Sequence, residues 1–206
     1  MIKLAVLVSG RGTNLAAILE AAREGRLGVR PVLVLSDRPD ARALSVAQTY
    51  GVRTAARDVA GPGGRRAFFA WAERELVESG AELIALAGFM RLLPAGMVQR
   101  FRWRILNIHP SLLPAFPGLD APRQAVEHGV RISGCTVHFV DEGMDTGPIV
   151  LQAAVPVLPD DTPGTLAARI RKEEHRLYPE AIRLFAAGRL RIEGRRVRIL
   201  PGQKDI

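Results

Sequence analysis

The sequence is poor in cysteine and in aromatic residues, and it has no long apolar run. Cys135 is the only cysteine among 206 residues, which excludes an intrachain disulfide and indicates a reducing compartment. No apolar run approaches the ~18–20 residues that span a bilayer. The apolar start of the chain is not followed by a signal-peptide cleavage site. We therefore expect a cytoplasmic globular protein with no membrane partner.

Negative charge is also in deficit, because the formal net charge is +8 and arginine supplies nearly all of the excess. A basic balance indicates an anionic partner, either a phosphorylated or carboxylated small molecule or a nucleic acid, although arginines can also simply decorate a solvated surface. The arginines are scattered, and aromatic residues are too few, at 5%, to interleave with them as in a nucleic-acid platform. We expect small-molecule substrates and no nucleic acid.

Apolar runs alternate with helical patterns through the first half of the chain. The mostly apolar run 2–8 predicts a strand buried on both faces, and Leu15, Ile18, Leu19 and Ala22 recur at helical spacing after it. The alternation continues with strands near 30–35, 52–55, 82–87 and 104–108, and with helices near 41–49, 65–78 and 95–101. This order predicts an α/β fold with a doubly wound, mostly parallel sheet.

The pattern changes after Gly129. Residues 132–140 and 149–157 are expected to pair as antiparallel strands, and a long helix from about Pro163 to Ala187 follows, capped by Asp161 or Thr162. A basic hairpin turning at Glu193-Gly194 is expected to close the fold. Without repeats or a low-complexity linker, the sequence predicts a single domain over residues 1–206.

A glycine-rich turn, "SGRGTNL" at 9–15, lies between the first strand and the first helix. Glycines at this place let the backbone approach an anion, and free N–H groups at the helix start can bind it. The turn lacks the Lys-Ser/Thr pair of a P-loop. A dinucleotide site would need a small residue in place of Leu15, although Asp37 stands where a ribose-binding acid would be. A monophosphate site fits best, and a purely structural turn remains the alternative.

Polar residues gather again in "LNIHPSLLPAFPG" and "DEGMDTGPI". Asn107 and His109 are two positions apart at the end of a strand, so their side chains share one face. Asp145 lies in a second glycine-rich loop. Acyl transfer to an amine passes through an oxyanion, which a carboxamide and an imidazolium can stabilise, and the imidazolium can then act as a general acid. A nearby carboxylate would raise the histidine pKa. We therefore predict Asn107, His109 and Asp145 as the catalytic residues of an enzyme.

Two rival interpretations of these residues are weaker. His109, His138 and Asp145 could form a facial metal site, but no tight ligand pair such as His-x-x-x-His is present. Cys135 as a nucleophile is disfavoured by its place in the middle of a strand. We therefore expect no metal.

Several ordered motifs give the chain a resemblance that runs almost from end to end. They are "LVSGRGTNL", "LAGFMRLL", "LNIHPSLLPAFPG", "SGCTVHFVDEGMDTGPIVLQ" and "EEHRLYPEAI". With them the chain resembles the folate-dependent phosphoribosylglycinamide formyltransferases of purine biosynthesis. The resemblance implies that 10-formyltetrahydrofolate donates a formyl group to glycinamide ribonucleotide, with Asn107, His109 and Asp145 catalytic. It leaves room for a homodimer.

The resemblance also implies two binding sets. The ribonucleotide would be held by a set in the glycine turn and the last long helix, namely Gly12, Thr13, Asn14, Leu15, Arg171 and Glu174. The pocket for formyl-folate would be lined by Arg65, Met90, Arg91, Leu92, Leu93, Asn107, Asp141, Glu142, Gly143, Met144 and Asp145. One departure is visible, because Asp120 stands where relatives often carry histidine.

Other proteins share the formyl-transfer core. Methionyl-tRNA formyltransferase adds a C-terminal domain for which we expect no room here, and formyltetrahydrofolate deformylase, a hydrolase, adds an N-terminal domain before a strand that begins here at residue 2. A nucleotide-binding module without chemistry is opposed by the clustering of Asn107, His109 and Asp145.

Overall fold

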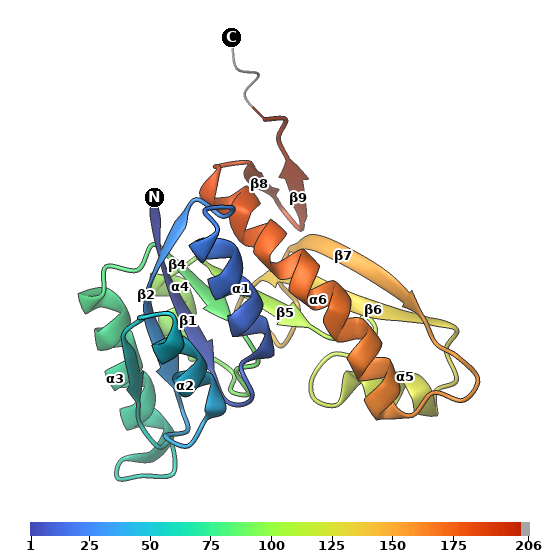
Figure 1. Cartoon of the computed structure of the whole chain (residues 1–206), viewed down its shortest axis with the longest axis horizontal. Helices are drawn as coiled ribbons and strands as arrows, with labels where there is room; N and C mark the ends of the chain where they lie inside the picture. The colour runs from blue at the N-terminus through green and yellow to red at the C-terminus, as the bar shows by residue number, and fades with distance from the viewer. Residues whose placement is uncertain (203–206) are drawn as a thin grey trace.

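The computed structural model describes residues 1–202, which form a nine-stranded mixed sheet with helices packed on it (Figure 1). The strand order is β3-β2-β1-β4-β5-β6-β7-β9-β8. The strands are β1 (Ile2–Val8), β2 (Val29–Ser36), β3 (Thr54–Ala56), β4 (Leu83–Leu86), β5 (Ile105–His109), β6 (Ile132–Phe139), β7 (Ile149–Pro156), β8 (Leu190–Glu193) and β9 (Arg196–Ile199). The helices are α1 (Thr13–Arg23), α2 (Arg42–Thr49), α3 (Gly64–Glu78), α4 (Ala95–Arg100), α5 (Ala121–Glu127) and α6 (Pro163–Ala186).

The N-terminal half is the predicted doubly wound parallel sheet. β1 pairs in parallel with both β2 and β4, and β3 and β5 extend the parallel part on either side. Alternate β1 side chains enter two separate cores: Leu4 packs in the core under α1 and α6, and Leu7 in the core under α3 and α4. The strand order reverses between β1 and β4, which is the place where ligands bind in sheets of this kind.

The C-terminal half is antiparallel at first, as predicted. β6 pairs antiparallel with β5 and with β7, and the hairpin β8–β9 turns at the expected place. Its attachment was not predicted, because β9 adds in parallel to the edge of β7 through Ile149 and Arg196. No periodic pattern of side chains encodes which edge a short hairpin joins.

The long helix α6 crosses the front of the sheet in Figure 1 and fastens two strands. Thr162 caps it through a reciprocal capping box with Thr165. The buried Tyr178 hydroxyl shares its hydrogen between the main-chain carbonyls of Leu86, the last residue of β4, and Leu106, the second residue of β5. This contact ties the helix to the strands on which the predicted catalytic residues lie.

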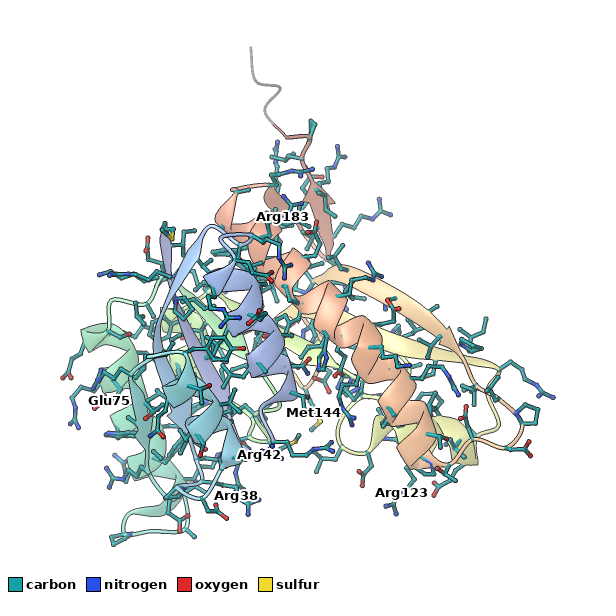
Figure 2. All side chains as sticks on the ribbon, viewed as in Figure 1. Arg38, Arg42, Glu75, Arg123, Met144 and Arg183 are labelled. Carbon is teal, nitrogen blue, oxygen red and sulfur yellow. The ribbon has the colours of Figure 1, made fainter. Side chains whose placement is uncertain are left out.

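Helix α5 was missed, since the sequence pattern predicted no helix between the strand near 104–108 and Gly129. The helix has seven residues, of which Ala121 and Ala125 are buried. Two small buried residues in so short a segment do not make a recognisable apolar stripe. Among residues 1–202, no helix is both long enough and apolar enough to cross a membrane. Figure 2 shows Arg38 and Arg42 in the lower left part of the molecule and Met144 nearer the middle of the view.

Candidate active site

The glycine turn ends in a helix start whose first N–H groups have no hydrogen-bond acceptor within residues 1–202. Gly12 is the N-cap of α1, and no side chain of that described part of the chain caps this end. Because the N–H of Ala16 bonds to the Gly12 carbonyl, the first free donors of the helix are the amides of Thr13, Asn14 and Leu15. Such a helix start favours an anion such as a phosphate. Leu15 can contribute only its amide, because its side chain is fully buried in the core.

Gly12 has two reasons to be glycine. Its φ of 79° lies in the left-handed region, and a Cβ at this position would approach the Cα of Ala43 to 2.8 Å. The carbonyl of neighbouring Gly10 accepts from the Ala43 amide. The turn is therefore packed tightly against α2, which keeps the free amides of α1 in place.

Helix α6 brings a carboxylate to the same turn. The side-chain nitrogen Nδ2 of Asn14 donates to Oε2 of Glu174 at 3.0 Å, across 160 residues of sequence. Burial raises the pKa of Glu174, and the Asn14 hydrogen bond and the charge of Arg171 offset part of that effect. The predicted ribonucleotide set thus meets in one place, with a half-buried Arg171 close enough to act on the carboxylate.

The three predicted catalytic residues also come together. Asn107 and His109 lie on β5, and Oδ2 of Asp145 is 3.4 Å from Nδ1 of His109. Oδ1 of Asp145 is 3.5 Å from Nδ2 of Asn107, and Oδ2 accepts from the Gly118 amide at 2.8 Å. His109 donates through Nε2 to the carbonyl of Phe116 at 2.8 Å. The carboxylate therefore joins β5 to the loop that follows it.

His138 belongs to this cluster as well, although the sequence pointed to it only as a possible metal ligand. It pairs directly with Asn107 across β5 and β6. Its Nδ1–H donates to the Phe139 carbonyl at 2.8 Å, so its Nε2 is free to accept from Nδ2 of Asn107 at 3.2 Å. This contact fixes which end of the Asn107 carboxamide faces His138. Only the strand register reveals the pairing, and register is not readable from one strand alone.

Burial governs the charge of His109. It lowers the histidine pKa below its ordinary value, although Asp145 and the Phe116 carbonyl act in the raising direction. Asp145 thus has the predicted raising effect, and the net lowering of the His109 pKa comes from burial, since the side chain is only 5% exposed. Burial also acts to raise the pKa of Asp145, but the neighbouring His138, the hydrogen bond from the Gly118 amide and the charge of His109 together lower it.

A cavity of about 330 Å³ opens beside these side chains. Its wall includes most of the predicted folate set, namely Met90, Arg91, Leu92, Leu93, Asn107, Gly143, Met144 and Asp145, together with His109 and His138. Met90, Leu92 and Met144 are each about half exposed or more, so apolar groups rim the opening. Leu119 and Asp120 of the loop before α5 also line it and were not predicted.

Three residues predicted to line the folate pocket do not reach this cavity. Arg65 is exposed and donates to the Leu92 carbonyl at 2.6 Å. The carboxylate of Asp141 turns back into its own loop, where it accepts from the Gly143 amide and the Thr146 hydroxyl. Glu142 is exposed. A role of these three residues in binding formyl-folate stays a prediction, since adjacency in sequence does not show where a side chain points.

The rival interpretations find no support in the geometry. Asp37 is 1% exposed and bonds to Arg91, so it does not face a ribose. Burial raises the pKa of Cys135 to about 12, which opposes a thiolate nucleophile. Within residues 1–202, no group of three or more His, Cys, Asp or Glu side chains is placed to hold a metal ion.

Comparisons with known proteins agree with this site. Residues 2–182 match the formyl transferase family. The phosphoribosylglycinamide formyltransferase of Bacillus subtilis is 42% identical over 183 residues, covering 89% of this chain and 94% of that protein. The crystal structure of glycinamide ribonucleotide transformylase 1 from Symbiobacterium toebii superposes with a TM-score of 0.95 at 59% identity, covering 98% of this chain and 95% of that one.

A longer relative matches over the same region. The trifunctional purine biosynthetic protein adenosine-3 of Drosophila melanogaster is 45% identical over 188 residues, covering 90% of this chain. The match spans 14% of the length of that fly protein. Together with the single α/β domain described above, these similarities mean that the chain belongs to the formyl transferase family, among its phosphoribosylglycinamide formyltransferases.

Proposed function

We propose that the protein transfers the formyl group of 10-formyltetrahydrofolate to the amino group of glycinamide ribonucleotide, a step of purine biosynthesis. The observation that carries the proposal is the position of Asn107, His109 and Asp145 on the wall of a cavity that also includes Met90, whose amide donates to Ser9 at the start of the glycine turn. Full-length similarity to phosphoribosylglycinamide formyltransferases supports it. The substrates are small molecules, and no metal takes part in the chemistry.

The two substrates occupy neighbouring places in this proposal. The ribonucleotide phosphate binds the free amides of Thr13, Asn14 and Leu15, and Glu174 accepts a hydrogen bond from the same substrate. The formyl-folate enters the cavity between the segment Met90–Leu93 and the loop at Gly143–Asp145. The formyl carbon is then presented to the amine beside His109.

The reaction forms one bond and breaks another. The lone pair of the amine makes the new C–N bond, the formyl oxygen becomes an oxyanion, and the bond from carbon to N10 of the folate then breaks. One proton passes from the amine to the leaving nitrogen, so tetrahydrofolate and formylglycinamide ribonucleotide are the products. The attacking amine has to be uncharged, and the oxyanion has to be stabilised.

Asn107 and His109 supply the donors for this oxyanion. One amide hydrogen of Asn107 is directed to His138 at 3.2 Å, whereas the contact to Asp145 is 3.5 Å and too long to hold the second hydrogen firmly. The contact between Nδ1 of His109 and Asp145 is also loose at 3.4 Å, while Nε2 is engaged by Phe116 at 2.8 Å. In the imidazolium form of His109, which carries a hydrogen on both nitrogens, the Nδ1 side is therefore the one from which a proton can turn to a substrate.

An acceptor assay tests this function. The purified protein is given 10-formyltetrahydrofolate with glycinamide ribonucleotide, with methionyl-tRNA or with no acceptor, and tetrahydrofolate release is followed together with formylated product. We expect turnover with the ribonucleotide and equal amounts of the two products. Release without an acceptor would indicate a hydrolase, and formylation of the tRNA would indicate a different transferase. A homodimer and a cytoplasmic location stay predictions from the sequence.

A further inference from the structure

The carboxylate of Asp37 is a buried charge without a role in the proposed reaction. It follows β2 and is 1% exposed, and its Oδ2 accepts from Nε of Arg91 at 2.8 Å. Its other oxygen, Oδ1, is buried without a hydrogen-bond partner among residues 1–202. The Arg91 side chain remains 43% exposed. Among residues 1–202 the charged partner of this carboxylate is Arg91, and removing one member of such a pair is costly because it leaves an uncompensated buried charge.

Arg91 belongs to a wall that regular structure does not hold. Residues 88–93 follow β4, lie outside helices and strands, and line the cavity. Phe89 and Leu93 are buried in the core and anchor the two ends of the segment, whereas Met90 and Leu92 are 60% and 47% exposed. Polar contacts therefore set the position of residues 90–92 between these two anchors.

Those polar contacts come from neighbouring elements. The Ser9 hydroxyl, at the end of β1, accepts from the Met90 amide at 3.0 Å, and Arg65 donates to the Leu92 carbonyl at 2.6 Å. Between Met90 and Leu92, Asp37 supplies a third contact, which is its ion pair with Arg91. An ion pair with one buried member is directional and costly to break, because the remaining charge loses its partner.

We propose that Asp37 is a positioning residue for the folate pocket: by holding Arg91 it fixes the backbone of residues 90–92 against which the formyl-folate binds. This inference rests on the proposed function, because it takes the cavity to be the folate site. Asp37 touches neither substrate. Its effect is on folate affinity, since the glycine turn that would bind the ribonucleotide is held separately by α2 and α6.

The test compares Asp37→Asn with Asp40→Asn. The first keeps the shape and removes the charge, whereas Asp40 is an exposed acid of the same loop, paired loosely with Arg38 at 3.5 Å. Steady-state kinetics give KM for both substrates and kcat, and calorimetric titration with tetrahydrofolate gives the product affinity directly. We expect Asp37→Asn to raise KM for formyl-folate and Kd for tetrahydrofolate roughly tenfold, as for the loss of one charge-assisted hydrogen bond. KM for the ribonucleotide and kcat should stay within about threefold of wild type, and Asp40→Asn should match wild type throughout.

Arg91→Gln and the double variant keep the idea testable if Asp37→Asn folds poorly, because the Arg91 side chain is partly in solvent. The two single variants should weaken tetrahydrofolate binding by similar factors, and the double variant by no more than the larger of them. The proposal would be overturned if the effects of the two single variants on the Kd for tetrahydrofolate multiplied in the double variant. An unchanged Kd in Asp37→Asn would also overturn it, as would tighter binding because Arg91 is released to the folate carboxylates. Failure of wild type to bind tetrahydrofolate would instead refute the proposed function.

Discussion

Nδ1 of His109 lies 3.4 Å from Oδ2 of Asp145, a residue that reaches this position with a left-handed φ of 55°. A non-glycine residue in this conformation is strained and persists only where its surroundings hold it. Here the carboxylate also accepts from the Gly118 amide. The strained backbone at Asp145 thus places its carboxylate beside the buried imidazole of His109.

This arrangement predicts how Asp145→Asn changes the pH dependence. Asp145 stabilises the imidazolium, so removing its charge should lower the His109 pKa further. The ratio of wild-type to variant kcat/KM cancels the titration of the shared amine substrate. It should rise between the two histidine pKa values and level off above the wild-type one. Because burial already lowers the His109 pKa, the ratio should increase at pH values below about 6.5. A ratio that is flat from pH 4.5 to 7 would contradict an electrostatic role and leave an orienting one.

Asn107→Ala and His109→Ala should act mainly on the transition state. Each should lower kcat, by about 10²–10³ for a lost oxyanion donor, while KM for formyl-folate changes little. The double variant should lose less than the product of the two factors, because both donors serve one oxygen. Rapid-quench measurement of formyl transfer isolates this step. Independent, multiplying losses would show that the two residues have separate tasks.

Gly12→Ala should damage both stability and ribonucleotide binding. The left-handed φ and the 2.8 Å approach to Ala43 suggest a loss of about 2–4 kcal/mol in the free energy of unfolding. KM for glycinamide ribonucleotide should rise as the turn shifts. Gly10→Ala is the stability control, since a Cβ there meets nothing within 4 Å. Urea unfolding gives the comparison, and equal losses for both variants would argue against the packing account.

The loop of Asp145 should depend on Asp141 and not on Glu142. Asp141 accepts from the Gly143 amide at 3.2 Å and the Thr146 hydroxyl at 2.6 Å, whereas Glu142 is exposed. Asp141→Ala should lower kcat/KM for formyl-folate by roughly 5–30-fold, which corresponds to about 1–2 kcal/mol for the lost contacts. Glu142→Ala should remain near wild type. A larger effect at Glu142 would mean that it contacts the folate after all.

The sequence predicted most of the fold because its apolar periodicity is strong. The parallel half, the antiparallel pair β6–β7 and the helix α6 follow from it with boundaries shifted by one or a few residues. The side on which Asn107 and His109 lie also follows, because strand side chains alternate. The contact between Asn107 and His138 depends on strand register, and the burial that lowers the His109 pKa depends on the loop around Phe116. Neither quantity is local in sequence.

In the residues predicted to bind folate, the motifs again indicate which segments lie near the cavity but not where each side chain points. Met90, Leu93 and Met144, which the motifs predict for the folate pocket, line the cavity, while Arg65 and Asp141 are not among its lining residues. Their side chains are drawn to nearby backbone and hydroxyl partners instead. Asp37 was flagged as a ribose-binding acid from its position after β2, and the partner that redirects it, Arg91, lies 54 residues away.

The most direct test of the central claim compares glycinamide ribonucleotide with glycinamide riboside, which lacks the 5′-phosphate. If the free amides at the start of α1 bind that phosphate, several charge-assisted hydrogen bonds are lost together, each worth about 1.5–3 kcal/mol. With formyl-folate saturating, kcat/KM should therefore fall by roughly 10³-fold or more for the riboside, which is about 4 kcal/mol or more. Equal kcat/KM values for the two acceptors would contradict the account.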